Sequence, residues 1–260
     1  MSVYEEGLVS IITPNYNCEK FIVETIESVI NQTYTKWEMI IVDDCSTDNS
    51  ITIARNYEKK DDRIKVIKNE RNMGAALSRN KAIEIAKGEY IAFLDSDDVW
   101  LENKLEKQLH FMKSNNCDFS FTEYYLMDMN SHSLFKTSKV IKKLTYNKML
   151  FHTFTGCLTV MYNQSEIGKV YGPDVKNCND KALFLKVLKK TNNAMGISLP
   201  LAKYRIRNNS ISSSKIKMLR PYIIVLNKHE NINKILCLFF VFTHVIIKKA
   251  LKYKKNYETF

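Results

Sequence analysis

Residues 90–98 read Tyr-Ile-Ala-Phe-Leu-Asp-Ser-Asp-Asp, a short apolar and aromatic run that leads directly into three carboxylates. A continuous apolar run of this length is typical of a strand that is buried on both faces of a sheet. Ligands of open α/β sheets bind beyond the carboxyl ends of the strands, where Asp95, Asp97 and Asp98 would lie. Carboxylates this close repel one another, and a cation that prefers oxygen ligands, such as Mg²⁺ or Mn²⁺, relieves the repulsion. The segment therefore predicts a ligand or metal site, and the alternative is a solvated acidic turn that caps the next helix.

The sequence before residue 90 alternates between apolar, strand-like runs and helical patterns. Strands are predicted at residues 8–13, 37–42 and 64–67, and helices at residues 17–30, 49–59 and 75–87. This alternation predicts an α/β fold with a Rossmann-like, mostly parallel sheet flanked by helices. The carboxyl ends of parallel strands lie along one edge of a sheet, and polar clusters follow three of these four predicted strands. We therefore expect the functional site at that edge.

The pattern after residue 98 is less regular. It predicts helices at residues 101–112, 145–152 and 180–189, strands at 119–125, 158–162 and 202–207, and a hairpin or loop over 130–145. A length of 260 residues suits one large domain, or one domain with an appendage. The six cysteines show no metal-binding spacing, and the first residues do not resemble a signal peptide. We therefore expect reduced thiols in a cytoplasmic protein.

Charge is unevenly distributed along the chain, whose net charge is +11. Residues 1–100 hold 12 basic and 18 acidic residues, whereas residues 215–260 hold 10 basic and 2 acidic residues. Residues 235–247 are almost entirely apolar. A helix of these 13 residues is about 20 Å long and is too short to span a membrane, which needs about 20 residues. Five lysines follow, at positions 248, 249, 252, 254 and 255. This pattern predicts a helix that binds a membrane surface, and the alternative is a helix packed on the domain.

Four segments, at residues 9–17, 42–48, 72–80 and 88–98, together carry a recognisable signature. In order and spacing they resemble the motifs of glycosyltransferase family 2, densely over residues 8–112, thinly over 113–213 and not beyond 215. The resemblance implies a GT-A type fold and an inverting transfer from a nucleotide sugar. It also implies a nucleotide-sugar-binding half (1–112) and an acceptor half (113–213). The basic, apolar pattern of the remaining residues predicts a helical tail (214–260).

The resemblance assigns the nucleotide base to the ends of the first two strands. Thr13, Pro14 and Tyr16 would line the base, and Asp44 would bind its edge. Arg79 would face the base or the diphosphate. The alternatives are ordinary structural roles, as a turn aromatic, a loop cap and a helix-surface arginine.

The same resemblance assigns the ribose and diphosphate to the end of the fourth strand. Asp95 would hold the ribose, and Asp97, with Asp95 beside it, would bind Mg²⁺ or Mn²⁺ bridging the diphosphate. Three polar neighbours complete the implied nucleotide-sugar site: Ser46, Asn72 and Ser96.

The acceptor side rests on two further positions. By resemblance, Asp180 would be the general base that deprotonates the acceptor hydroxyl, and Asn179 stands where the family usually has a glutamate. The alternative for Asp180 is a helix N-terminal residue favoured by the helix dipole. Arg207 stands where the family often has a histidine. An arginine cannot ligate a metal, but it can hold a diphosphate through two hydrogen bonds, and its alternative is a surface position.

These features predict a hexosyl- or N-acetylhexosaminyltransferase that moves a sugar, from a UDP-sugar in our expectation, to a lipid-linked surface glycan such as lipopolysaccharide or capsule. We expect it to act at the inner face of the cytoplasmic membrane, held there by its tail. One alternative is transfer directly to polyprenyl phosphate, and another is a non-catalytic nucleotide-sugar-binding protein. Nucleic acid is not an expected partner, because the basic half contains no nucleic-acid-binding motif.

Overall fold

The computed structural model describes residues 4–151, 155–191, 193–207 and 215–257, and it describes the side chains in the last of these ranges only for residues 219–246. The first part of the chain alternates strand and helix, as predicted. Its elements are β1 (Glu5–Asn15), α1 (Ile22–Ile30), β2 (Trp37–Asp43), α2 (Ser50–Glu58), β3 (Ile64–Lys68), α3 (Ala75–Ile85) and β4 (Gly88–Phe93). The helix expected from Asn17 begins later, because Asn17 has a φ of 50° and its Oδ1 accepts the Thr47 N–H instead.

The second part is a mixture of short strands and helices. Its elements are β5 (Val99–Trp100), α4 (Lys104–Ser114), β6 (Phe119–Met127), β7 (Ser133–Thr137), β8 (Lys143–Leu144), α5 (Tyr146–Phe151), η1 (Cys157–Thr159), β9 (Met161–Asn163), α6 (Gln164–Ile167), α7 (Asn179–Leu188) and β10 (Ala194–Arg205). The strand predicted over 158–162 is mostly wrong, because its first residues form the short 3₁₀ helix η1. The strand predicted at 202–207 is the end of the longer β10.

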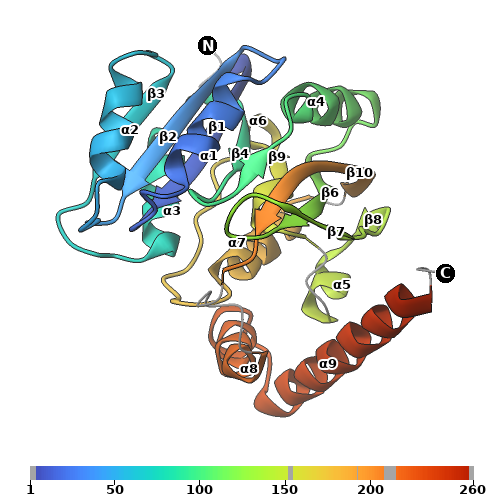
Figure 1. The fold of residues 1–260 in the computed structure, drawn as a ribbon. Coiled ribbons are helices and arrows are strands. Elements are labelled where there is room, and N and C mark those ends of the chain that lie inside the picture. The colour runs from blue at the N-terminus through green and yellow to red at the C-terminus, as the bar shows by residue number, and fades with distance from the viewer. Residues whose placement is uncertain (1–3, 152–154, 192, 208–214, 258–260) are drawn as a thin grey trace.

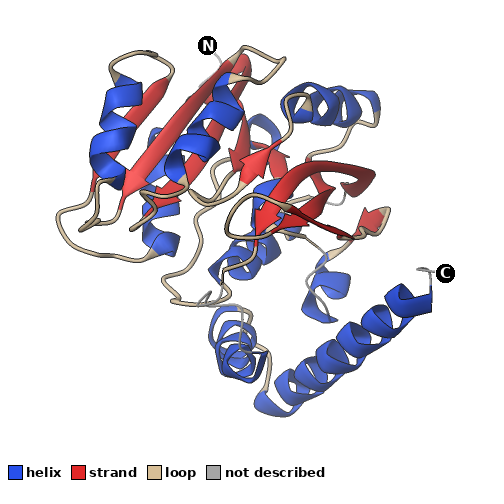
Figure 2. Cartoon of the chain, in the orientation of Figure 1, coloured by secondary structure: helices blue, strands red, loops and turns tan. Residues whose placement is uncertain are grey.

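The described strands form one sheet in the order β3-β2-β1-β4-β9-β6-β10-β5, with β7 beside β6 and β8 beside β10 (Figures 1 and 2). Strands β3, β2, β1 and β4 are parallel, which confirms the prediction for the first part. Strand β9 runs antiparallel to both β4 and β6, so the complete sheet is mixed. The carboxyl ends of β2, β1 and β4 consequently lie side by side at one edge.

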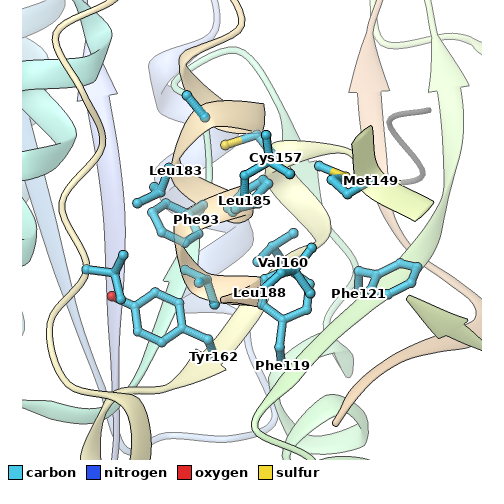
Figure 3. Close-up of a cluster of buried hydrophobic side chains, with 14 of the residues drawn as sticks. Phe93, Phe119, Phe121, Met149, Cys157, Val160, Tyr162, Leu183, Leu185 and Leu188 are labelled. Carbon is cyan, nitrogen blue, oxygen red and sulfur yellow. The ribbon is translucent and has the colours of Figure 1, made fainter. Parts of the chain in front are cut away.

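Strand β4 is buried on both faces, as its apolar run predicts. Ile91 and Phe93 belong to one hydrophobic core with α3, α5 and α7, whereas Tyr90, Ala92 and Leu94 belong to a second core with α1, α2 and α4. In the first core, the ring of Phe184 from α7 meets Phe93 and Phe119 edge-on, with centroid distances of 5.5 and 5.9 Å. Figure 3 shows Phe93 and Phe119 in this core together with Leu183 and Leu185 of the same helix. This packing fixes α7 against the sheet and so places its N-terminus.

The C-terminal tail consists of α8 (Lys215–Ile224), the π-helical turn η3 (Val225–His229) and α9 (Lys234–Tyr257). Six of its side chains are buried in the first core: Tyr222, Val225, Leu226, Cys237, Phe240 and Val241. The carboxylate of Glu230, between η3 and α9, accepts hydrogen bonds from the Tyr146 hydroxyl at 2.5 Å and pairs with Lys189 Nζ at 2.6 Å. The tail therefore packs on α5 and α7. The predicted domain boundary at 213–214 lies outside the described residues.

Helix α9 carries apolar side chains on two opposite faces. Cys237, Phe240 and Val241 face the core, where the Phe240 ring packs on Phe151 with centroids 4.8 Å apart. The other face is 48% to 83% exposed and comprises Ile235, Leu238, Phe239, Phe242 and Ile246, which we call the outer stripe. Among the described residues, no helix combines the length and apolarity that a membrane span requires. The side chains of the lysines after residue 247 lie outside the described residues.

Candidate active site

The loops after β1 and β2 are joined by a buried carboxylate. Asp43 Oδ1 accepts the Asn15 side-chain N–H at 2.7 Å and the Ser46 hydroxyl at 2.6 Å. Ser46 in turn accepts the Asn17 backbone N–H at 3.0 Å. This arrangement holds the ends of β1 and β2 together, and it makes Ser46 part of the loop scaffold.

The residues assigned to the base lie at the end of β1 with different exposures. Thr13 is buried, and no described group hydrogen-bonds its Oγ1. Pro14 is half-buried. Tyr16 leaves the strand and is 49% exposed, so its ring is available to a ligand.

The carboxylate of Asp44 holds the loop before α3. Its oxygens accept the backbone N–H groups of Met73 and Gly74, both at 2.7 Å, and the side-chain amide of Asn69 at 2.8 Å. Gly74 has a φ of 84°, a conformation that favours glycine, and the Asn72 side chain donates to the Asp44 carbonyl at 3.1 Å. A carboxylate has about four acceptor positions, so Asp44 keeps one for a ligand.

The guanidinium of Arg79 lies between the two halves of the chain. Its Nη2 donates to Asp95 Oδ1 at 2.5 Å, and its Nη1 donates to Asn179 Oδ1 at 2.6 Å. The side chain is buried, and its Nε has no hydrogen-bond partner among the described groups. Arg79 is therefore not the surface residue of the alternative, and it joins the end of β4 to the start of α7.

Asp97 is paired with an arginine that is distant in the sequence, Arg207. Arg207 Nη1 lies 2.9 Å from Asp97 Oδ2, although 110 residues separate the two positions. Burial, and then the negative charge of Asp95, raise the pKa of Asp97, and Arg207 opposes that shift. A carboxylate in this position favours a nearby cation. Between the two carboxylates, Ser96 is buried and hydrogen-bonds the Cys18 thiol.

Arg205 was given no role from the sequence, and the structure supplies one. Its backbone N–H donates to Asp98 Oδ1 at 2.9 Å, and its Nε donates to the Asp97 carbonyl at 2.8 Å. The guanidinium also pairs with Glu24 on α1. Arg205 thus fixes the backbone that carries Asp97. Burial, with the charges of Asp97 and Asp95, raises the pKa of Asp98 well above its usual range.

The carboxyl of Asp180 lies in the first turn of α7. Its Oδ1 accepts the backbone N–H of Lys181 at 2.8 Å, and the side chain is half-buried. Because Asn179 bonds to Arg79, the start of α7 lies next to Asp95. The predicted donor and acceptor residues therefore meet at one edge of the sheet.

The carboxylates of this edge offer oxygen ligands of the kind that Mg²⁺ and Mn²⁺ prefer. Within the described residues, however, no group of three or more Asp, Glu, His or Cys side chains is placed to hold a metal ion. Asp97 and Asp95 could supply two of the ligands of a metal ion, and the other ligands would have to come from the bound substrate or from water. Each of them is already beside an arginine, which would have to share the carboxylate.

The model of the family described as glycosyl transferase family 2 matches residues 10–166. The chain belongs to glycosyltransferase family 2. The match covers more than half of the protein and includes the ends of β1, β2 and β4. The resemblance seen in the sequence is thereby confirmed, and the protein is a glycosyltransferase.

Two bacterial relatives extend the similarity over most of the glycosyltransferase. It is 47% identical over 226 residues to TuaG of Bacillus subtilis (strain 168), a glycosyltransferase provisionally named for teichuronic acid biosynthesis, with 87% of this chain and 90% of the relative covered. It is 39% identical over 256 residues to WfgD of Escherichia coli, with 97% and 99% covered. WfgD is named a UDP-Glc:α-D-GlcNAc-diphosphoundecaprenol β-1,3-glucosyltransferase.

The fold is that of GT-A glycosyltransferases, as predicted. The structure of residues 1–349 of TarS from Staphylococcus aureus, in complex with UDP-GlcNAc, superimposes with a TM-score of 0.70. The match covers 90% of this chain and 70% of that 1–349 chain at 23% sequence identity. At that identity the likeness establishes the fold.

Proposed function

We propose that this glycosyltransferase moves a sugar from a UDP-sugar, with inversion, to a hydroxyl of a lipid-linked surface glycan on the inner side of the cytoplasmic membrane. The observation that carries the proposal is the convergence of Asp95, Asp97 and Asp180 with Arg79 and Arg207 at one edge of the sheet. Two carboxylates and two guanidiniums suit a metal-bound diphosphate. The third carboxylate lies at the start of a helix that joins this cluster through Asn179. The name of the relative WfgD supports a UDP-sugar and a diphosphate-lipid acceptor.

On the donor side, the arginines would bind the diphosphate and the carboxylates would bind the metal ion. Arg207 can bind the diphosphate through two hydrogen bonds, and Asp97 with Asp95 would hold Mg²⁺ or Mn²⁺. The bound metal would neutralise charge on the leaving diphosphate. Tyr16 would contact the base, and Asp44 would accept a hydrogen bond from its edge, whereas the buried Thr13 would act only by shaping the end of β1. Ser46 and Asn72 would act mainly by holding the loops that carry these residues.

On the acceptor side, Asp180 would remove the proton of the attacking hydroxyl. Inversion requires the base on the face of the sugar opposite the leaving group. Asp180 comes from α7, whereas Asp95 and Asp97 follow β4, so the base and the donor ligands belong to different halves of the chain. The Asp180 carboxylate is half-buried, and the Lys181 N–H sets its orientation. A base that is held in place and still reachable by an acceptor needs both properties.

The tail would hold the enzyme near its lipid-linked acceptor. The outer stripe presents five apolar side chains at helical spacing, on the face of α9 opposite the core. Residues 215–260 carry 10 basic and 2 acidic residues, which favours an anionic membrane surface. Apolar contact and positive charge together are what an interfacial helix needs.

A panel of UDP-, GDP- and dTDP-sugars tests this function, with release of the nucleoside diphosphate measured in Mn²⁺ and in EDTA. We expect release from a UDP-sugar that is lost in EDTA and in Asp97→Ala. Transfer to a GlcNAc diphosphate on a short alkyl chain should be lost in Asp180→Asn and kept in the exposed control Asp174→Asn. Transfer to polyprenyl phosphate, or UDP-sugar binding without release, would overturn the proposal in favour of one of the alternatives.

A further inference from the structure

The residue directly after the candidate base is a buried lysine. Lys181 is 3% exposed, and its Nζ has no hydrogen-bond partner among the described groups. The Nζ lies 3.6 Å from the centroid of the Tyr222 ring. Burial lowers the pKa of Lys181 to about 7, against the charges of Cys178 and Asp180. An amine in such a position requires a specific partner, because a buried charge without one is strongly unfavourable.

The tail provides that partner. Tyr222 lies on α8 and is itself buried. Its hydroxyl donates to the Leu150 carbonyl of α5, and its ring meets the imidazole of His244 on α9 at a centroid distance of 5.4 Å. The ring is thus held by α5 and α9 and presents its face to α7. An aromatic face attracts an ammonium, and more strongly when both are removed from water.

The contact reaches the candidate base through the neighbouring residue in the same helix. The backbone N–H of Lys181 donates to Asp180 Oδ1, so the conformation of residue 181 orients the carboxylate. Below pH 7, where Lys181 is mostly protonated, loss of the Tyr222 ring forces the ammonium either to leave the core and reach water or to lose its proton. A side chain that leaves the core pulls on the first turn of α7.

We propose that Tyr222 of the tail is a positioning residue for sugar transfer, which holds Lys181 in the core and thereby fixes the first turn of α7 and the Asp180 carboxylate. This inference rests on the proposed role of Asp180. It gives the inner side of the tail a task in transfer that is separate from membrane binding by the outer stripe. The occupied face of Tyr222 and the exposed outer stripe belong to different surfaces of the tail.

The test measures transfer from UDP-glucose to a GlcNAc diphosphate on a short, water-soluble alkyl chain at pH 6, where the Lys181 amine is mostly protonated, using the full chain without membranes. We expect Tyr222→Leu to lower kcat at least tenfold with the KM for UDP-glucose unchanged within twofold. Tyr222→Phe keeps the ring and should stay within threefold of the unmodified protein. The matched control is Tyr57→Leu, because Tyr57 also lies under a lysine, with Lys60 Nζ at 5.8 Å, but belongs to α2.

A double-mutant cycle separates the amine–ring contact from simple packing. In a Lys181→Met background, Tyr222→Leu should cost less than threefold, because no buried charge then depends on the ring. An equal loss in both backgrounds, or a Tyr222→Leu enzyme within twofold of the unmodified protein, overturns the inference. Should Tyr222→Leu not fold at the assay temperature, Tyr222→Met in both backgrounds gives the same comparison. Transfer that survives Asp180→Asn would instead refute the proposed function.

Discussion

Replacement of Lys181 by methionine should stabilise the protein, and by more at pH 6 than at pH 9. The folded-state pKa of Lys181 is about 7, whereas an unfolded lysine titrates near about 10.4. Between these values the unfolded chain binds a proton that the folded protein does not, so the free energy of unfolding rises with pH. The destabilisation caused by the amine is therefore full below pH 7 and disappears above about pH 10.5. Methionine has a similar length and packs well against an aromatic ring.

The magnitude follows from the two pKa values. A shift of one unit corresponds to about 1.4 kcal/mol, so the amine costs about 5 kcal/mol at pH 6 and about 2 kcal/mol at pH 9. The methionine variant should therefore gain about 2 to 3 kcal/mol more at pH 6 than at pH 9 relative to the unmodified protein. The titratable groups around the amine are Asp180, Cys178, Tyr222 and, behind the ring, His244. These groups are present in both the unmodified protein and the methionine variant, so their own titration contributes nearly equally to the two free energies of unfolding and largely cancels in the difference.

Urea unfolding of the two proteins at pH 6, 7.5 and 9 measures this difference directly. The control is Lys186→Met on the same helix, where the lysine is only half-buried and donates to the Tyr171 carbonyl at 3.0 Å. We expect the control to show less than a third of the pH dependence of Lys181→Met. A stabilisation by Lys181→Met that is equal at pH 6 and pH 9, within about 0.5 kcal/mol, would refute the assignment of a buried, proton-releasing amine.

Three further changes test other parts of the structure. Asp44→Ala removes the acceptor of two backbone N–H groups and should lower the free energy of unfolding by about 1 to 3 kcal/mol in urea, whereas an unchanged value would mean that the loop is held otherwise. Arg207→Ala should raise the KM for the nucleotide sugar more than tenfold, and a change confined to kcat would contradict a role in diphosphate binding. The double variant Phe239→Ser, Phe242→Ser should sediment with anionic vesicles at least tenfold less well, while Phe135→Ser, which is exposed elsewhere, should bind normally.

The parallel part of the sheet could be predicted from local patterns because each strand there carries its own evidence. The apolar run of β4 feeds two cores through alternate residues, and this periodicity is visible in the sequence. The bounds of strand β9 could not be predicted in the same way, since the strand is three residues long and only the last residues of the predicted strand 158–162 belong to it, after the turn η1. Its place between β4 and β6 depends on pairing with strands far away in the sequence.

The candidate site shows the same division between local and distant information. The acidic segment after β4 was found from its composition, but its neighbours Arg207 and Arg205 come from more than 100 residues away. Arg79 was expected to face the nucleotide, and nothing in the sequence indicated that its guanidinium also hydrogen-bonds the side chains of Asp95 and Asn179. Lys181 gave no signal at all, because a lysine in a helix normally reaches solvent. Only the packing of Tyr222 from the tail over Lys181 shows that this lysine does not reach solvent.

The boundary between the parallel part of the sheet and the rest of the sheet is itself a strand. Strand β9 is hydrogen-bonded to β4 on one side and to β6 on the other, so the backbone ladder continues from the first part of the chain to the second. Two lobes joined in this way cannot swing apart about a hinge, as many enzymes do to admit and release their substrates. Substrate exchange must instead use the loops beyond the strand ends and the side chains on them. An inhibitor designed against this enzyme would therefore have to fit the loops beyond the strand ends, because the continuous sheet beneath them does not separate.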